Sequence, residues 1–132
     1  MSKKKIQYIA SACLCGIPCR YDGKAKPNNK VIELMQKGEV FPVCPEVFAG
    51  EKTPRPAATR QKNGRILENE SGKDITDIYK KGASQAMNVC KSFDIKKSFL
   101  KKGSPTCGED GIFTELLQVN GIETEIKDKG DE

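Results

Sequence analysis

The chain has no histidine among its 132 residues. Imidazole is the usual acid or base of catalysis near neutral pH, so that kind of proton transfer is excluded. The histidine ligands of most catalytic zinc sites are excluded as well. Any proton transfer must therefore use Cys, Asp, Glu, Lys, Tyr or a water molecule.

Long apolar runs are also missing. The lysine-rich start MSKKK leads into an apolar run that is too short for a signal peptide or a membrane span. We therefore expect a cytoplasmic chain with no membrane association. Its six cysteines would then be reduced thiols, which in that compartment more often bind metal or do chemistry than form disulfides. No C-x2-C pair is present, so a thiol–disulfide protein is the least favoured alternative.

The charge pattern gives little support for a nucleic-acid partner. The formal net charge is +5, but lysines alternate with acidic residues and no arginine-rich stripe is interleaved with aromatics. Repeats and low-complexity segments are absent. We expect residues 1–132 to form a single domain, long enough to bury a core, with a charged tail at about residues 127–132.

The hydrophobic pattern alternates between strands and helices. Short apolar runs predict strands at residues 6–12, 40–43, 98–100 and 122–126. Helical spacing predicts helices at residues 30–37, 74–92 and 114–119. Asn28 or Asn29 would cap the first of these helices, and Asp74 or Thr76 the second. With right-handed crossovers this order predicts an α/β fold: a small, doubly wound, Rossmann-like three-layer sandwich with a mostly parallel sheet.

Residues 45–75 contain many prolines and glycines and look irregular. Residues 65–67 suggest a small hairpin arm within this stretch. A structureless loop of this length is unusual inside a compact domain and is commonly functional. A plain surface loop is the alternative for its tip.

Three cysteines far apart in the sequence each follow a predicted strand: Cys13, Cys44 and Cys107. Successive parallel strands end at one edge of a sheet, and ligands bind in the crevice there. Soft thiolates meeting at this edge suit an iron–sulfur cluster or zinc. Three ligands in place of four would leave one metal ion open, which is typical of a chemical site.

The other cysteines have more than one interpretation. Cys90 falls on the apolar face of a predicted helix and is expected to be a core residue. Cys15 lies in a loop and could be incidental. Cys19 could be a fourth ligand, a catalytic thiol or a packed side chain. Among the charged residues near the predicted edge, Arg20 and Arg55 are either substrate-binding residues or ordinary surface charges.

Four blocks of the sequence resemble, in the same order, the signatures of one bacterial family. They are SACLCGIPCRYDG (residues 11–23), VCPEVFAG with TPRPA (43–57), GKDIT with KKGA (72–83), and SPTCG (104–108). The family was first defined as a domain of unknown function and contains 2-thiouracil desulfidase. The resemblance spans roughly residues 8–126.

The resemblance implies a [4Fe–4S] cluster held by three cysteines, with the fourth iron free to take sulfur from a thiolated nucleobase. Cys13, Cys44 and Cys107 match the ligands. Glu46 and Ser104 match positions beside them and become candidates for proton transfer and for positioning substrate or water. The alternatives are an ordinary surface acid for Glu46 and, for Ser104, a hydroxyl that only hydrogen-bonds the turn it starts. Cys19 matches a family cysteine and is kept as a third catalytic candidate.

The sequence departs from the family pattern after SPTCG. The family usually has a longer stretch with Gly and aromatic residues there, whereas Gly108 here is followed almost directly by the predicted last helix. A shorter segment predicts a more open and wetter pocket. The alternative to an enzyme is a zinc- or cluster-binding module without catalysis, acting as a redox or partner-binding protein.

Overall fold

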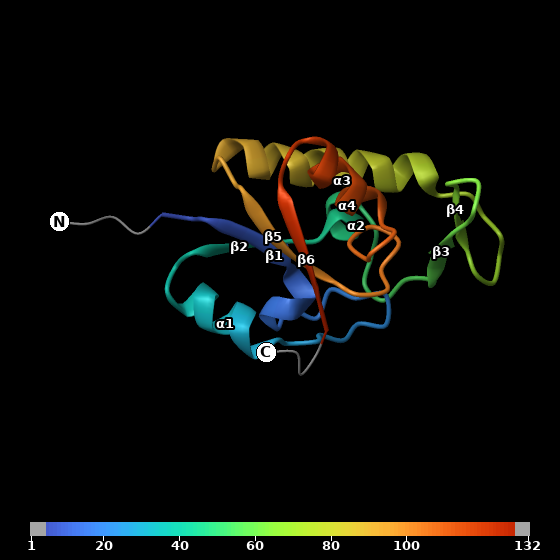
Figure 1. The fold of residues 1–132 in the computed structure, drawn as a ribbon. Coiled ribbons are helices and arrows are strands. Elements are labelled where there is room, and N and C mark those ends of the chain that lie inside the picture. Colours follow the sequence, from blue (N-terminus) through green and yellow to red (C-terminus); the bar gives the residue numbers. More distant parts are fainter. Residues whose placement is uncertain (1–4, 129–132) are drawn as a thin grey trace.

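A four-stranded parallel sheet forms the centre of the structure, a computed structural model that describes residues 5–128 (Figure 1). Its strands are β1 (Tyr8–Ser11), β2 (Val40–Val43), β5 (Lys97–Lys101) and β6 (Glu123–Lys127). They lie in the order β2-β1-β5-β6, and every neighbouring pair is parallel. The strand order therefore reverses at β1, as in other doubly wound sheets.

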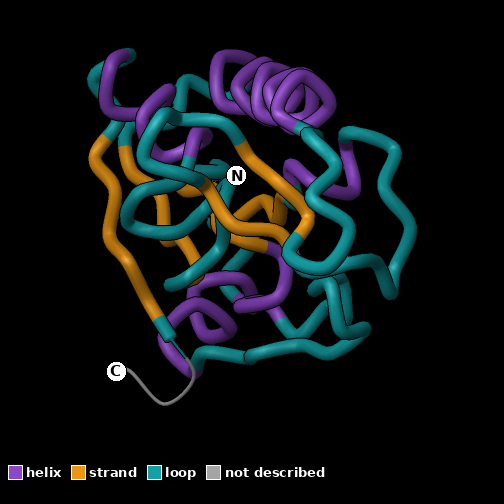
Figure 2. The backbone as a smooth tube through the Cα atoms, turned by 90° about the vertical axis from the view of Figure 1, so that its right-hand side faces the viewer, coloured by secondary structure: helices purple, strands orange, loops and turns teal. Residues whose placement is uncertain are grey.

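Helices cover both faces of this sheet (Figures 1 and 2). Helix α1 (Asn29–Gln36) lies on one face, while α3 (Thr76–Ser92) and α4 (Ile112–Val119) lie on the other. The short helix α2 (Pro45–Phe48) follows β2 and packs against α3. The predicted α/β three-layer architecture is confirmed.

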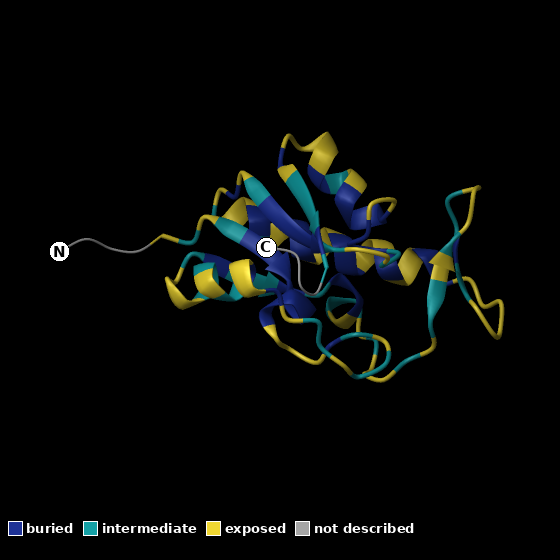
Figure 3. Cartoon of the chain, turned by 60° about the horizontal axis from the view of Figure 1, so that its bottom comes forward, coloured by how far each residue is buried: buried dark blue, intermediate teal, exposed yellow. Residues whose placement is uncertain are grey.

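Each face of the sheet has its own apolar core. The larger core lies under α3 and α4 and includes Tyr79, Leu100 and Phe113. The smaller core lies under α1 and includes Leu14 and Val31. Cys90 is buried in the larger core, as predicted, and Cys15 is buried in the smaller one. In the sheet, the central strands β1 and β5 are mostly buried, whereas the edge strands β2 and β6 contain more half-buried positions (Figure 3).

The stretch 45–75 is more ordered than its composition predicts. Helix α2 opens it, which the sequence reading missed because four residues are too few for a periodic signal. Strands β3 (Ala58–Arg60) and β4 (Ile66–Glu68) then pair antiparallel, so the hairpin arm is confirmed. The arm extends away from the sheet beside one end of α3 (Figures 1 and 3).

Helix ends follow local side-chain chemistry. Asn28 caps α1, because its Oδ1 accepts the amide of Val31 at 3.1 Å. At α3 the predicted cap was wrong: Ile75 occupies the cap position without a side-chain hydrogen bond. Asp74 instead accepts the backbone N–H and the hydroxyl of Thr76. Helix α4 begins two residues earlier than predicted, at Ile112.

No helix in residues 5–128 is long and apolar enough to cross a membrane. The predicted charged tail lies mainly outside the described residues, since β6 continues to Lys127.

Candidate active site

The carboxyl end of the sheet holds a cavity of about 250 Å³. It lies where β1 and its neighbour β5 end, at the topological switch point, which is the usual ligand position in open α/β sheets. Four cysteine side chains line it: Cys13, Cys19, Cys44 and Cys107. The three cysteines predicted to meet at this edge therefore line one cavity, and Cys19 joins them.

A side chain links the two central strands at this point. Main-chain pairing of β1 with β5 runs to the Ala10–Phe99 pair. One residue further on, the hydroxyl of Ser11 accepts the backbone N–H of Lys101 at 2.9 Å. The same hydroxyl lies beside the thiol of Cys107. Ser11 therefore fixes the distance between the chain segments that follow the two strands.

Cys13 lies in a single 3-10 turn, residues Ala12–Cys15, that follows β1 directly. The turn ends at Gly16, whose φ of 92° favours glycine. The carbonyl of Cys13 accepts the amides of Gly16 at 3.2 Å and Lys26 at 3.0 Å. These bonds hold the backbone, so the side chain faces the cavity from a fixed position.

Cys44 is the cap residue of α2, with Pro45 at the first helical position. A close approach of α3 places this short helix. A Cβ on Gly82 would overlap the carbonyl oxygen of Pro45 and would lie 2.9 Å from Cβ of Ala49. Glycine at position 82 therefore lets α2, with Cys44 before it and Glu46 within it, pack directly on the backbone of α3.

Cys107 lies in a turn organised by Ser104. The Ser104 hydroxyl accepts the backbone N–H groups of Thr106 at 3.1 Å and of Cys107 at 3.2 Å. Its carbonyl accepts the amide of Gly108 at 2.8 Å. A Cβ at Gly108 would overlap that carbonyl, so the turn needs glycine there.

The thiols interact with one another. The Cys44 thiol donates to the Cys19 carbonyl at 3.9 Å. The neighbouring Cys13 thiol, together with burial, raises the pKa of Cys19 to about 11. The pKa of Cys44 is raised by its hydrogen bond to Cys19 and by burial, and that of Cys107 by burial. These thiols are therefore neutral near pH 7 without a metal, and a metal would displace their protons on binding.

The donor set fits an iron–sulfur cluster. Free thiols are the ligands that such clusters use, and they come from three separate strand ends. In residues 5–128, no three Cys, Asp or Glu side chains are placed to hold a single metal ion. A cluster distributes its cysteines over several irons, so they need not converge on one point. Cys13, Cys44 and Cys107 could hold it, with Cys19 as the fourth thiol of the cavity.

Glu46 is a buried carboxylate at the cavity wall, with a side chain 10% exposed. Its Oε1 accepts from Arg55 Nε at 3.0 Å and from the Tyr79 hydroxyl at 3.3 Å. Its Oε2 accepts from the hydroxyls of Ser104 at 3.1 Å and Thr106 at 3.0 Å. One oxygen therefore has a charged donor and the other has two hydroxyls. The structure brings together the predicted pair Glu46 and Ser104.

Both predicted arginines line the cavity. The guanidinium of Arg55 forms an ion pair with Glu46 at 2.9 Å and its side chain is only 4% exposed. Burial alone would lower the pKa of Arg55, but the charge and hydrogen bond of Glu46 outweigh it and raise the pKa. Arg20 lies 3.6 Å from the carboxylate of Asp22 and 5.5 Å from the centre of the Tyr21 ring.

Sequence reasoning missed several residues of the site. Tyr79 has the spacing of an ordinary core residue of α3, and only its contact with Glu46 reveals it. Thr106 could have been suspected from its place inside SPTCG. Thr59 and Asn69, on the hairpin arm, also line the cavity, where the Thr59 hydroxyl donates to Asn69 Oδ1 at 2.7 Å. No local signal places a hairpin arm against a distant strand end.

The segment that follows Gly108, expected from the sequence to be shorter than in the family, begins with a closed turn. Gly111 N–H donates to the Gly108 carbonyl at 2.9 Å, and the Thr114 hydroxyl donates to the same carbonyl at 2.6 Å. Arg60 of the hairpin arm reaches this segment, donating to the Asp110 carbonyl at 3.0 Å and pairing with Glu115. The arm is thus anchored to the segment that follows Gly108.

Fold and site together define a class: a doubly wound α/β domain with a thiol-lined ligand cavity at the switch point of its sheet. Comparison with known proteins identifies the family. The model of the family described as 2-thiouracil desulfurase matches residues 9–130. The chain belongs to this family, as the sequence motifs predicted.

Two relatives agree with this assignment. The solved structure of the [4Fe-4S]-dependent thiouracil desulfidase TudS superposes with a TM-score of 0.85 and is 36% identical. That alignment covers 93% of this chain and 91% of TudS. The uncharacterized protein YbbK of Bacillus subtilis (strain 168) is 33% identical over 113 residues, covering 80% of this chain and 75% of YbbK.

Proposed function

We propose that this protein removes sulfur from a thiolated nucleobase, or a similar thiocarbonyl compound, in a non-redox reaction that depends on a [4Fe–4S] cluster. Water replaces sulfur: the C=S bond becomes C=O, and sulfide is released with the two protons of the water. No electron acceptor is needed. The single observation that supports this most is the meeting of three cysteine thiols with a buried Glu46–Ser104 pair in one cavity.

Cys13, Cys44 and Cys107 would hold the cluster, whose open iron would supply a Lewis acid for the substrate sulfur. The backbone groups of the three cysteines form hydrogen bonds within the turn after β1, the turn at Ser104 and the first turn of α2. The thiols are therefore held by backbone geometry before any metal binds.

Glu46 would take the proton from the attacking water. Its Oε2 faces only neutral hydroxyl donors, whereas Oε1 is bound by Arg55. Oε2 is thus the oxygen at which a proton can be accepted. The chain has no histidine, so no imidazole can do this work.

Ser104 would orient water or substrate. Two backbone N–H groups point at its oxygen, so its own proton can turn between Glu46 Oε2, the Thr106 hydroxyl and a bound water or substrate. Cys19, whose thiol neighbours those of Cys13 and Cys44, remains the third catalytic candidate. We place the protein in the cytoplasm, where its thiols stay reduced, and a small thiolated molecule is the partner.

Glu46→Gln tests this function. Gln is nearly isosteric but cannot take a proton, so the brown colour and iron content should persist while the rate per cluster falls on the order of 10²–10⁴-fold. Ser104→Ala should keep the cluster and lose less activity. A Glu46→Gln protein that turns over at the wild-type rate would remove the acid–base role.

A further inference from the structure

The two arginines of the cavity, Arg20 and Arg55, differ in how many of their side-chain N–H groups have a hydrogen-bond partner. All five N–H groups of Arg55 have partners within the protein. Nε and one N–H of Nη2 bind Glu46, and the second of Nη2 binds the Cys19 carbonyl at 2.9 Å. Nη1 donates to the Lys52 carbonyl at 3.3 Å and to the Thr53 hydroxyl at 3.2 Å. Arg55 has no donor left for a substrate.

Arg20 is different. Its Nη1 is buried and has no hydrogen-bond partner in the part of the chain that the structure describes. Its Nη2 has one distant ionic partner, Asp22 at 3.6 Å. A buried donor without an acceptor is unfavourable, and this one belongs to a side chain that lines the cavity. The guanidinium of Arg20 therefore has hydrogen-bonding capacity that the described residues do not use, and it belongs to a side chain at the cavity wall.

Arg55 also fixes the loop that carries Arg20. Its side chain binds the carbonyl of Cys19, and its backbone N–H donates to the carbonyl of Tyr21 at 2.8 Å. Both neighbours of Arg20 in the sequence are thus held by one residue. The guanidinium of Arg20 then lies over the Tyr21 ring, which restricts it further.

We propose that Arg20 recognises the substrate and that Arg55 is a positioning residue for both Arg20 and Glu46. This proposal rests on the proposed function. In it, Arg20 donates a hydrogen bond to a second acceptor on the thiolated ring, an exocyclic carbonyl oxygen separate from the sulfur. The preferred substrates are then heterocyclic thiocarbonyls that also carry a ring carbonyl, such as thiouracils. Thiopyrimidines that lack this oxygen would leave Arg20 unpaired.

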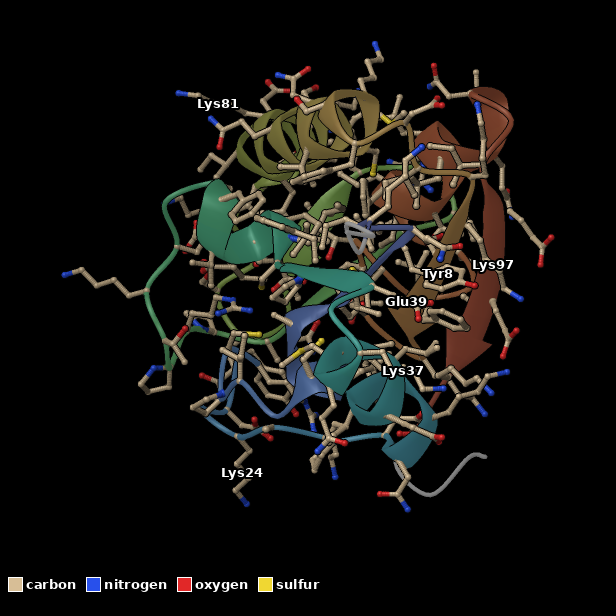
Figure 4. All side chains as sticks on the ribbon, turned by 90° about the vertical axis from the view of Figure 1, so that its left-hand side faces the viewer. Tyr8, Lys24, Lys37, Glu39, Lys81 and Lys97 are labelled. Atoms are coloured by element: carbon tan, nitrogen blue, oxygen red, sulfur yellow. The ribbon has the colours of Figure 1, made fainter. Side chains whose placement is uncertain are left out.

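The experiment compares two substrates in four reconstituted proteins. The substrates are 2-thiouracil and pyrimidine-2-thione, which lacks the 4-carbonyl oxygen. The proteins are the wild type, Arg20→Met, Arg55→Lys and the control Lys24→Met, which removes a charge from an exposed side chain of the same loop that points to solvent (Figure 4). A hydrogen bond to a charged donor predicts a wild-type preference for 2-thiouracil of about 10- to 100-fold in kcat/KM.

Arg20→Met should abolish this preference and raise KM for 2-thiouracil. Arg55→Lys should lower kcat/KM for both substrates through Glu46, and should weaken the preference less than Arg20→Met does, because its backbone hydrogen bond to the Tyr21 carbonyl survives the substitution. Lys24→Met should behave as the wild type. The proposal is overturned if the Arg20→Met protein still prefers 2-thiouracil over pyrimidine-2-thione. It is also overturned if Arg55→Lys removes this preference and Arg20→Met does not.

Binding of uracil separates this proposal from the proposed function, since it needs no turnover. Calorimetry should show binding to the wild type and to Lys24→Met, and at least tenfold weaker binding to Arg20→Met. Dependence on Arg20 without any desulfuration would refute the proposed function and leave the recognition role standing. Equal binding by wild type and Arg20→Met, or no binding by either, would refute the role of Arg20.

Discussion

Gly82→Ala should inactivate the protein from a position outside the cavity. The added methyl would overlap the Pro45 carbonyl, and Cβ of Ala49 at 2.9 Å prevents a sideways escape. Because these are backbone and short side-chain atoms, α2 must shift away from α3. Helix α2 carries Glu46 and begins directly after Cys44, so the shift reaches both the proton acceptor and a metal ligand.

The expected effects on stability and activity differ in size. Alanine in place of a helical glycine favours the helix by about 1 kcal/mol, while overpacking costs about 1–3 kcal/mol. The net loss of unfolding free energy is therefore roughly 0–2 kcal/mol, and the variant should fold. A displacement of about 1 Å at a reacting group can cost about 10²-fold in rate.

Desulfuration rate per cluster and thermal unfolding should be measured side by side, with Ser84→Ala as the control. Ser84 is on the exposed face of the same helix, and its replacement should leave both quantities unchanged. If Gly82→Ala is folded, loaded with iron and fully active, the placement of α2 by Gly82 is wrong.

Three further predictions concern the cysteines and the pocket. Replacing any one of the predicted ligands Cys13, Cys44 and Cys107 by serine should abolish cluster binding, which iron analysis after anaerobic reconstitution measures. Cys90→Ser should retain iron. If Cys90→Ser loses iron while Cys44→Ser keeps it, the prediction that the strand-end cysteines are the ligands is wrong. Turnover of free 2-thiouracil should be slower than in relatives with a longer segment after Gly108, and equal rates under the same conditions would contradict this. Burial raises the pKa of Cys90 to about 11 from 9.0, so the neutral thiol stabilises the fold below pH 9. The Cys90 thiol should account for about 2–3 kcal/mol of the stability lost as the pH rises from 9 to 11, so denaturant titrations should show a loss smaller by that amount in Cys90→Ala.

Local patterns in the sequence predicted the sheet, its three longer helices and the meeting of three cysteines at one edge, because each depends on neighbouring residues. Strand ends are visible in the apolar runs before Cys13 and Cys44, and parallel order then brings them to one edge. The contacts of Glu46 were not predictable in this way. They join α2 to Tyr79 of α3 and to the turn at Ser104, and only tertiary packing places those three segments together.

The different states of the two arginines were also beyond sequence reasoning. Arg20 and Arg55 both lie in Gly- and Pro-rich loops, and composition gives them the same two interpretations. They differ in how many guanidinium N–H groups already have a hydrogen-bond partner. This number depends on where the carbonyl groups of neighbouring loops lie, which only the folded structure shows. Helix α2 was missed for a simpler reason, its length of four residues.

The most direct test of the account is turnover by the reconstituted wild-type protein in ¹⁸O-labelled water under anaerobic conditions, without an electron acceptor. Hydrolytic desulfuration predicts one ¹⁸O in each uracil formed from 2-thiouracil and one sulfide released per uracil, at a rate proportional to bound iron. A protein that binds the four-iron cluster but releases no sulfide from any thiolated base, or a colourless protein with stoichiometric zinc, would contradict it.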